Sequence, residues 1–301
     1  LVDDVLELAA DRPPSRGRAL ASLAAAMVSI TTGEIERSLA EWTAGYDDGI
    51  AIGDDEVAAE GCMGMGYVHL SAGNLDAAME PLERALELSG DESPYMHSLS
   101  LAIKGMLLFQ LGHHDQGFAM VEEALKVQRQ QKDCEGGGIA WSFLASMSFA
   151  RGDLVKAREY YAESLATFEE VGDRPEIARV HCETGWTALA DEDVPAARDS
   201  FRRAVLAYEE VGSVRGTGLG MLGLAAVEAA EGRSARAVTI AEAAQALADR
   251  AGVVCDHPRD PGVVERIEAL KVSIPAGTGD GLVAGASGLT PAAVLDLVSQ
   301  T

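Results

Sequence analysis

Four short stretches of the sequence carry residue types that could bind a cofactor or a metal, or attack a bond. Gly218–Gly223 matches GxGxxG, the glycine pattern that can cradle a pyrophosphate at a strand-to-helix turn. His113–Asp115 (His-His-Asp) and Cys255–His257 (Cys-Asp-His) offer ligand types that zinc accepts. The pair His181–Cys182 places an imidazole beside a thiol, as a cysteine nucleophile requires.

Each stretch also has a simpler structural explanation. The GxGxxG segment follows no strand and lies within a predicted helix, where glycines allow close packing. His113–Asp115 coincides with a predicted solvated turn, and Cys255–His257 needs further ligands from elsewhere. Successive side chains on a helix diverge by about 100°, so His181 and Cys182 do not face each other. No GxxxxGK(S/T), GxSxG or HExxH motif occurs, and we expect no catalytic residue, cofactor or metal.

The elements that position these stretches are set by a repeat of about 40 residues. The residues seven before, five after and twelve after each turn marker are always small, as Gly185, Ala197 and Ala204 are around Glu192. Large apolar residues such as Phe201 follow most markers by nine. Small residues at fixed spacing allow two backbones to approach closely, so the pattern predicts six stacked helical hairpins. The markers are Gly33, Gly73, Gly112, Gly152, Glu192 and Gly232.

Helix ends can be located from single residues. Asp153, Asp173 and Asp193 are predicted N-caps, whose carboxylates accept hydrogen bonds from free helix N–H groups. Gly172 and Gly212 follow two helix ends, where glycine adopts the left-handed conformation without strain. Each repeat therefore consists of helix A, a short turn and helix B.

Composition supports an all-α chain and excludes some partners. Of the 301 residues 48% are hydrophobic but only 5% aromatic, and alanine is abundant. A net charge of −24 repels phosphate backbones, so we exclude direct nucleic-acid binding. The four cysteines are too scattered for a disulfide framework, and no apolar run could span a bilayer. We expect a cytoplasmic protein without membrane association.

The repeat phase divides the chain into three parts. Residues 1–14 are predicted to be the remnant of a preceding hairpin, and the absence of an initial Met indicates a fragment. Residues 15–251 form the repeat array. Residues 252–301 form a C-terminal capping segment, with helices predicted over 261–272 and from Thr290 to Val298.

The small, small, bulky and small residues Gly185, Ala197, Phe201 and Ala204 match the tetratricopeptide signature. The sequence therefore resembles a tetratricopeptide repeat protein, which implies a right-handed superhelical solenoid. Its period exceeds the usual length of about 34, so its helices are longer. This long-period variety, with phrases such as Gly152–Arg158 and Gly288–Val294, is similar to helical-repeat regions of bacterial signal-transducing ATPases and LuxR-type regulators. That resemblance implies a sensor or scaffold arm with an ATPase upstream.

In tetratricopeptide arrays, fixed positions of helix A line the concave wall. Exposed Met, Tyr and Trp beside one Arg suit an extended peptide or an apolar ligand with one acidic group. Alternatively, a tight superhelix buries these residues against its own turns. The predicted lining residues are Glu60, Met63, Tyr67, Met106, Ser142, Ser146, Arg179, Cys182 and Trp186.

Three functions remain open from the sequence. The first is a non-catalytic module that binds a protein, peptide or small-molecule effector, as the sensor arm of a larger bacterial regulator. The second is a free-standing adaptor that assembles protein partners. The third is an enzyme accessory or catalytic chain that uses Cys182 or the region around Cys255.

Overall fold

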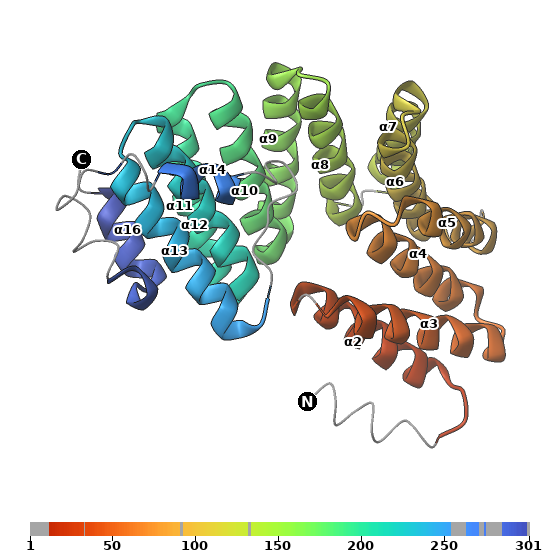
Figure 1. Ribbon diagram of the computed structural model, residues 1–301. Helices are drawn as coiled ribbons and strands as arrows, with labels where there is room; N and C mark the ends of the chain where they lie inside the picture. The colour runs from red at the N-terminus through yellow and green to blue at the C-terminus, as the bar shows by residue number, and fades with distance from the viewer. Residues whose placement is uncertain are drawn as a thin grey trace. The chain divides into compact units, whose positions relative to one another are not determined.

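The computed structural model describes residues 12–32, 34–90, 93–131, 134–253, 263–270, 274 and 285–299. Within these residues the chain forms fourteen α-helices and one 3₁₀ turn, and no strand (Figure 1). The prediction of an all-α stack of hairpins is confirmed. The chain separates into two compact units, unit 1 ending at Gly152 and unit 2 beginning at Asp153.

Unit 1 is a run of antiparallel hairpins. Helices α2 and α3, α4 and α5, and α6 and α7 pair as A and B helices of successive repeats, and α8 follows as the next helix A. Each helix A also contacts the helix A of the next repeat, from α2 to α4, α6 and α8. The helices are α2 (Arg16–Thr32), α3 (Ile35–Ile52), α4 (Asp55–Ser71), α5 (Leu75–Ser89), α6 (Pro94–Gln110), α7 (His114–Gln131) and α8 (Cys134–Ala150).

Unit 2 continues the pattern and ends differently. After α9, the hairpins α10/α11 and α12/α13 pack against one another, and shorter C-terminal elements follow. Its elements are α9 (Leu154–Val171), α10 (Arg174–Ala190), α11 (Val194–Glu210), α12 (Val214–Ala230), α13 (Ser234–Ala251), α14 (Val263–Ala269), η2 (Ala286–Gly288) and α16 (Pro291–Ser299).

The small and large columns of the sequence meet inside the hairpins. A Cβ atom added at Gly66 would lie 2.5 Å from Leu82 Cγ, which is too close for a real side chain. At Gly185 the added atom would lie 2.7 Å from Phe201 Cδ1. Each glycine thus supplies the space that a bulky residue of the partner helix fills, as the spacing predicts.

The turns and caps also follow the sequence. Asp153 accepts a hydrogen bond from the Lys156 N–H at 3.1 Å, and Asp193 accepts one from Ala196 at the same distance. The marker Gly152 has φ 78°, and Glu192 holds the same left-handed conformation with φ 59°. Since only glycine adopts this conformation without a steric penalty, Glu192 is a strained residue in its turn.

The C-terminal elements lie against the last hairpin. Val263 and Ile267 of α14, together with Val294 and Val298 of α16, are buried in one apolar cluster with residues of α12 and α13. Within the helix predicted over 261–272, the described residues Val263–Ala269 form α14. The predicted remnant at residues 1–14 falls, up to residue 11, outside the described residues.

Candidate functional site

Helix α4 carries a narrow open stripe along one side. Glu60, Met63 and Tyr67 are each partly exposed, and their spacing of three and four residues places them on one helical face. The opposite sides of α4 are buried because glycines let neighbouring helices approach. A Cβ at Gly61 would lie 2.8 Å from the Tyr46 nitrogen, and one at Gly64 would lie against the Trp42 ring. The stripe is therefore one part of α4 that the hairpin packing leaves partly open.

The same three positions recur on the other A helices of unit 1, and together we call them the inner wall. Among its twelve residues, Glu60 is the single charged one. The wall is most open at α2, where Leu20 is 43% and Met27 is 52% exposed, whereas Met106 on α6 is only 8% exposed. The inner wall consists of Leu20, Leu23 and Met27 on α2, Glu60, Met63 and Tyr67 on α4, Leu99, Ala102 and Met106 on α6, and Ile139, Ser142 and Ser146 on α8.

Glu60 is a partly exposed carboxylate on this largely apolar wall. Within the described part of the chain, no hydrogen bond or ion pair reaches its oxygens. Burial raises the pKa of Glu60, repulsion from Glu56 adds to the rise, and attraction from Arg16 opposes it. Arg16 itself is engaged by Glu56 at 3.2 Å and by Asp54 at 3.5 Å.

Unit 2 contains the predicted residues Arg179, Cys182 and Trp186 of α10. Arg179 donates two hydrogen bonds to Glu176, at 2.8 Å from Nε and 2.6 Å from Nη2. Cys182 and Trp186 are buried, and the Trp186 ring packs edge-on against Phe201 with centroids 5.1 Å apart. The sequence analysis expected an acidic group on the ligand because Arg179 could pair with it. In the structure, the Arg179 guanidinium already pairs with the Glu176 carboxylate on the same helix.

The predicted lining residues thus differ in exposure, and both alternatives left open by the sequence occur among them. Glu60, Met63, Tyr67, Ser146 and Arg179 are partly open. Four others belong to the packed interior, because neighbouring helices of the same repeat stack cover them. These four are Met106, Ser142, Cys182 and Trp186.

The stretches that could do chemistry are held in structural roles where they are described. Gly220 and Gly223 of the GxGxxG segment face Val205 and Phe201 across a helix crossing inside unit 2. Cys182 is buried, while burial and the nearby Arg203 lower the pKa of His181. The His114 ring stacks on Phe109 with centroids 4.5 Å apart.

The remaining thiol and metal candidates give no further site. Burial raises the pKa of the Cys62 thiol to about 11, which keeps it protonated at neutral pH. No group of three or more His, Cys, Asp and Glu residues in the described ranges could hold a metal ion. Cys255 and His257 lie outside those ranges.

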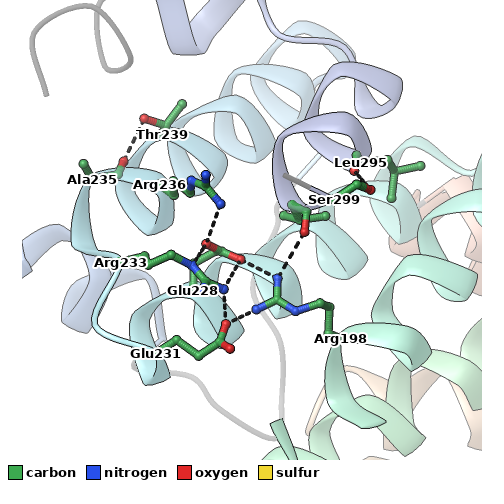
Figure 2. Close-up of polar contacts among 10 residues, drawn as sticks. Arg198, Glu228, Glu231, Arg233, Ala235, Arg236, Thr239, Leu295 and Ser299 are labelled. Carbon is green, nitrogen blue, oxygen red and sulfur yellow. Dashed lines mark hydrogen bonds and ion pairs between the residues drawn. The ribbon is translucent and has the colours of Figure 1, made fainter. Parts of the chain in front are cut away.

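Sequence inspection missed a buried charge cluster in unit 2, which Figure 2 shows. Glu228 of α12 is fully buried and accepts hydrogen bonds from Arg198 of α11 at 2.5 Å and from Arg233 Nη2 at 3.0 Å. Arg236 approaches Glu228 at 3.9 Å, and Glu231 pairs with both Arg198 and Arg233. The sequence did contain a signal, because the equivalent positions in the three preceding repeats carry the uncharged, buried residues Leu108, Ser148 and Ala188.

No helix in the described residues is both long and apolar enough to cross a bilayer.

Comparisons with known proteins agree with the hairpin geometry. Three family models described as tetratricopeptide repeat match residues 138–210, 104–171 and 59–92. A comparison with curated proteins gives no significant match.

Solved structures show the same fold at low sequence identity. A Rap protein complexed with competence and sporulation factor has a TM-score of 0.69 and 14% identity, over 99% of this chain and 81% of that one. BtubC (BKLC) from P. vanneervenii has a TM-score of 0.52 and 20% identity, over 83% and 94% of the two chains. Aspartyl phosphate phosphatase F from Bacillus subtilis has a TM-score of 0.54 and 12% identity, over 89% and 74%.

The family matches cover the central repeats, and the same small-to-large packing extends across the described hairpins on either side. The chain therefore contains tetratricopeptide repeats, at residues 59–92 and 104–210.

Proposed function

We propose that this chain is a non-catalytic module that binds a peptide on the inner wall of unit 1. The observation that carries the proposal is the open stripe of α4 with Met63 and Tyr67, together with the exposed Leu20 and Met27 at the equivalent outer positions of α2, a helix that contacts α4. Large contiguous apolar patches on protein surfaces commonly mark interaction sites. Thioether and aromatic groups adapt to the side chains of an extended peptide.

The fold comparison supports a binding role in general terms. The Rap structure was solved in complex with competence and sporulation factor. At 14% identity this likeness concerns the fold, so an effector for the present chain is our proposal. A stack of hairpins presents its A helices as a continuous surface, which suits an extended partner.

The proposal of a non-catalytic role is supported by the state of the reactive groups. Cys182 is buried, and His181 precedes it on the same helix, so their side chains diverge. The Cys62 thiol is held in its protonated form. A protonated thiol is not the nucleophilic form of cysteine, so Cys62 does not supply a nucleophile.

Resemblance to long-period repeat regions further leads us to propose that the chain is the sensor or scaffold arm of an ATPase-linked bacterial regulator. Reading the coding sequence on both sides tests this context. A P-loop motif upstream supports the sensor arm. Stop codons close to both ends contradict it and favour a free-standing adaptor.

Binding itself can be tested with a library of capped hexapeptides. The peptides are N-acetylated and C-amidated, and they draw their residues from Ala, Val, Leu, Met, Phe and Lys. Peptides retained by the immobilised protein are quantified by mass spectrometry. The double variant Met63→Ser/Tyr67→Ser is expected to retain at least tenfold less, because it removes apolar contact area from the stripe.

The matched control replaces an apolar residue that is exposed elsewhere. Leu206→Ser in unit 2 changes a side chain that is 50% exposed and lies outside the inner wall. Retention by this variant should equal that of the wild type. Equal retention by the wild type and the α4 double variant would show that the stripe is not the binding surface.

A further inference from the structure

We infer that Glu60 selects peptides that carry a single cationic side chain, with the ammonium or guanidinium group seated against its carboxylate. This inference deepens the proposed peptide-binding role and rests on it. It concerns the charge of the partner, which the apolar stripe alone leaves open.

The surroundings of Glu60 make it unusual in unit 1. It stands on the stripe of α4 before Met63 and Tyr67, and Leu20 occupies the equivalent position on the adjacent α2. None of the other eleven inner-wall residues is charged. A carboxylate in such surroundings loses part of its hydration, and a cation from a partner would compensate for that loss.

Other buried or partly buried carboxylates in the described residues are paired with a cation or a hydrogen-bond donor of the chain itself. Asp48 is engaged by Arg18, and Glu41 accepts hydrogen bonds from Arg37 and Ser29. In unit 2, Glu228 has its arginines. Glu60 departs from this rule, because no hydrogen bond or ion pair in the described ranges reaches it.

The charges near Glu60 indicate that the partner should be positively charged at this point. Glu56 lies one turn before Glu60 on the same helix and adds negative potential. The cation that could neutralise the pair, Arg16, is shared between Glu56 and Asp54. An acidic peptide would therefore be repelled, whereas a basic side chain gains an ion pair in partly desolvated surroundings.

The partner also needs an apolar body. Met63 and Tyr67 continue the stripe by about two helical turns from Glu60 without another charge. A peptide with one Lys or Arg followed by apolar residues matches this order. A peptide with several cations would leave some of them unpaired against the apolar part of the wall.

Three capped hexapeptide libraries test the inference. All draw five positions from Ala, Val, Leu, Met and Phe, and the remaining position is fixed as Lys, norleucine or Glu. Binding is measured as the amount retained by the wild type, by Glu60→Gln and by Glu80→Gln. Glu80 is an exposed residue of α5, so its substitution removes one negative charge without touching the stripe.

We expect the wild type and Glu80→Gln to retain the Lys library about tenfold more than the norleucine library. The Glu library should be retained least. Glu60→Gln should retain the Lys and norleucine libraries equally, because an uncharged amide gives a cation no ion pair.

The outcomes separate the two proposals. Equal retention of all three libraries by the wild type overturns the role of Glu60 and leaves the peptide-binding function standing. Retention of none of them overturns both. A Lys preference that persists in Glu60→Gln shows that another carboxylate recognises the cation, which also overturns the inference.

Discussion

Substituting Glu228 by Gln should destabilise the C-terminal part of unit 2. Glu228 is fully buried, while the side chains of Arg198 and Arg233 are 13% and 30% exposed. Removing one partner of a buried ion pair costs about 3–5 kcal/mol, because the other charge remains buried without compensation. Gln keeps the shape and one acceptor, and Arg233 can regain some water. We therefore expect the lower end, about 3 kcal/mol.

The control is Glu231→Gln, which removes the same charge from the same cluster. Glu231 also pairs with Arg198 and Arg233, but its side chain is 32% exposed. Water screens such pairs, so the change should cost about 1 kcal/mol or less. The difference between the two variants isolates the effect of burial.

Hydrogen–deuterium exchange read by mass spectrometry suits this protein because it reports on each helix separately. For amides that exchange through unfolding, a loss of about 3 kcal/mol corresponds to exchange about a hundredfold faster. We expect this in α12, α13 and α16, since the Val298 carbonyl of α16 accepts a hydrogen bond from Arg198 at 3.5 Å. Helices α2 to α6 of unit 1 serve as the internal reference.

The pH dependence gives a second measurement. Burial alone would raise the pKa of Glu228, but hydrogen bonds and attraction from Arg233 and Arg198 outweigh burial and lower it. The carboxylate therefore stabilises the folded state above the ordinary Glu pKa, and this stabilisation is lost as the pH falls through the lowered folded pKa. The difference in the free energy of unfolding between the wild type and Glu228→Gln should therefore become smaller as the pH falls. The reasoning would be refuted if Glu228→Gln and Glu231→Gln destabilised the protein equally. It would also be refuted if the stability difference between the wild type and Glu228→Gln did not depend on pH.

Three further predictions concern single positions. Glu192→Gly should raise the free energy of unfolding by about 1 kcal/mol in urea titrations, because φ 59° strains a residue with a Cβ, and an unchanged value would argue against strain. Gly185→Ala should cost about 1–3 kcal/mol, since its Cβ would lie 2.7 Å from Phe201, while Gly137→Ala, with no atom within 4 Å, should cost nothing measurable. Glu60→Gln should make the unliganded protein more stable at pH 7. Because folding raises the pKa of Glu60, its ionisation above the ordinary Glu pKa destabilises the folded state, and Gln removes that cost. That difference should vanish below about pH 4, and its persistence there would point to a packing effect.

Much of the fold could be predicted from the sequence because its determinants are local and repeat. Where two helices cross closely, only a small residue fits, so Gly66 and Gly185 mark hairpin crossings. The cap of Asp153 needs only the next few residues of its own chain. A period of about 40 then propagates one hairpin geometry along the chain.

Which residues of the candidate site are exposed was decided by tertiary packing. Tyr67 and Met106 occupy equivalent positions in neighbouring repeats, yet Tyr67 is partly open and Met106 is 8% exposed. Trp186 has the same helical position and lies on Phe201 in the interior. Burial at these positions is decided by the sizes of side chains on adjacent helices, which the position of a residue within its own repeat does not specify.

Charge partnerships were likewise decided by the folded chain. Arg198 reaches Glu228 from 30 residues earlier in the sequence, and Arg18 reaches Asp48 across the same separation. Glu60 is left without such a partner in the described residues, which its position within the repeat does not reveal. The sequence by itself determined where the hairpins form, since small residues permit close crossings. Only the tertiary structure decided which carboxylates are satisfied, because their partners lie on different helices.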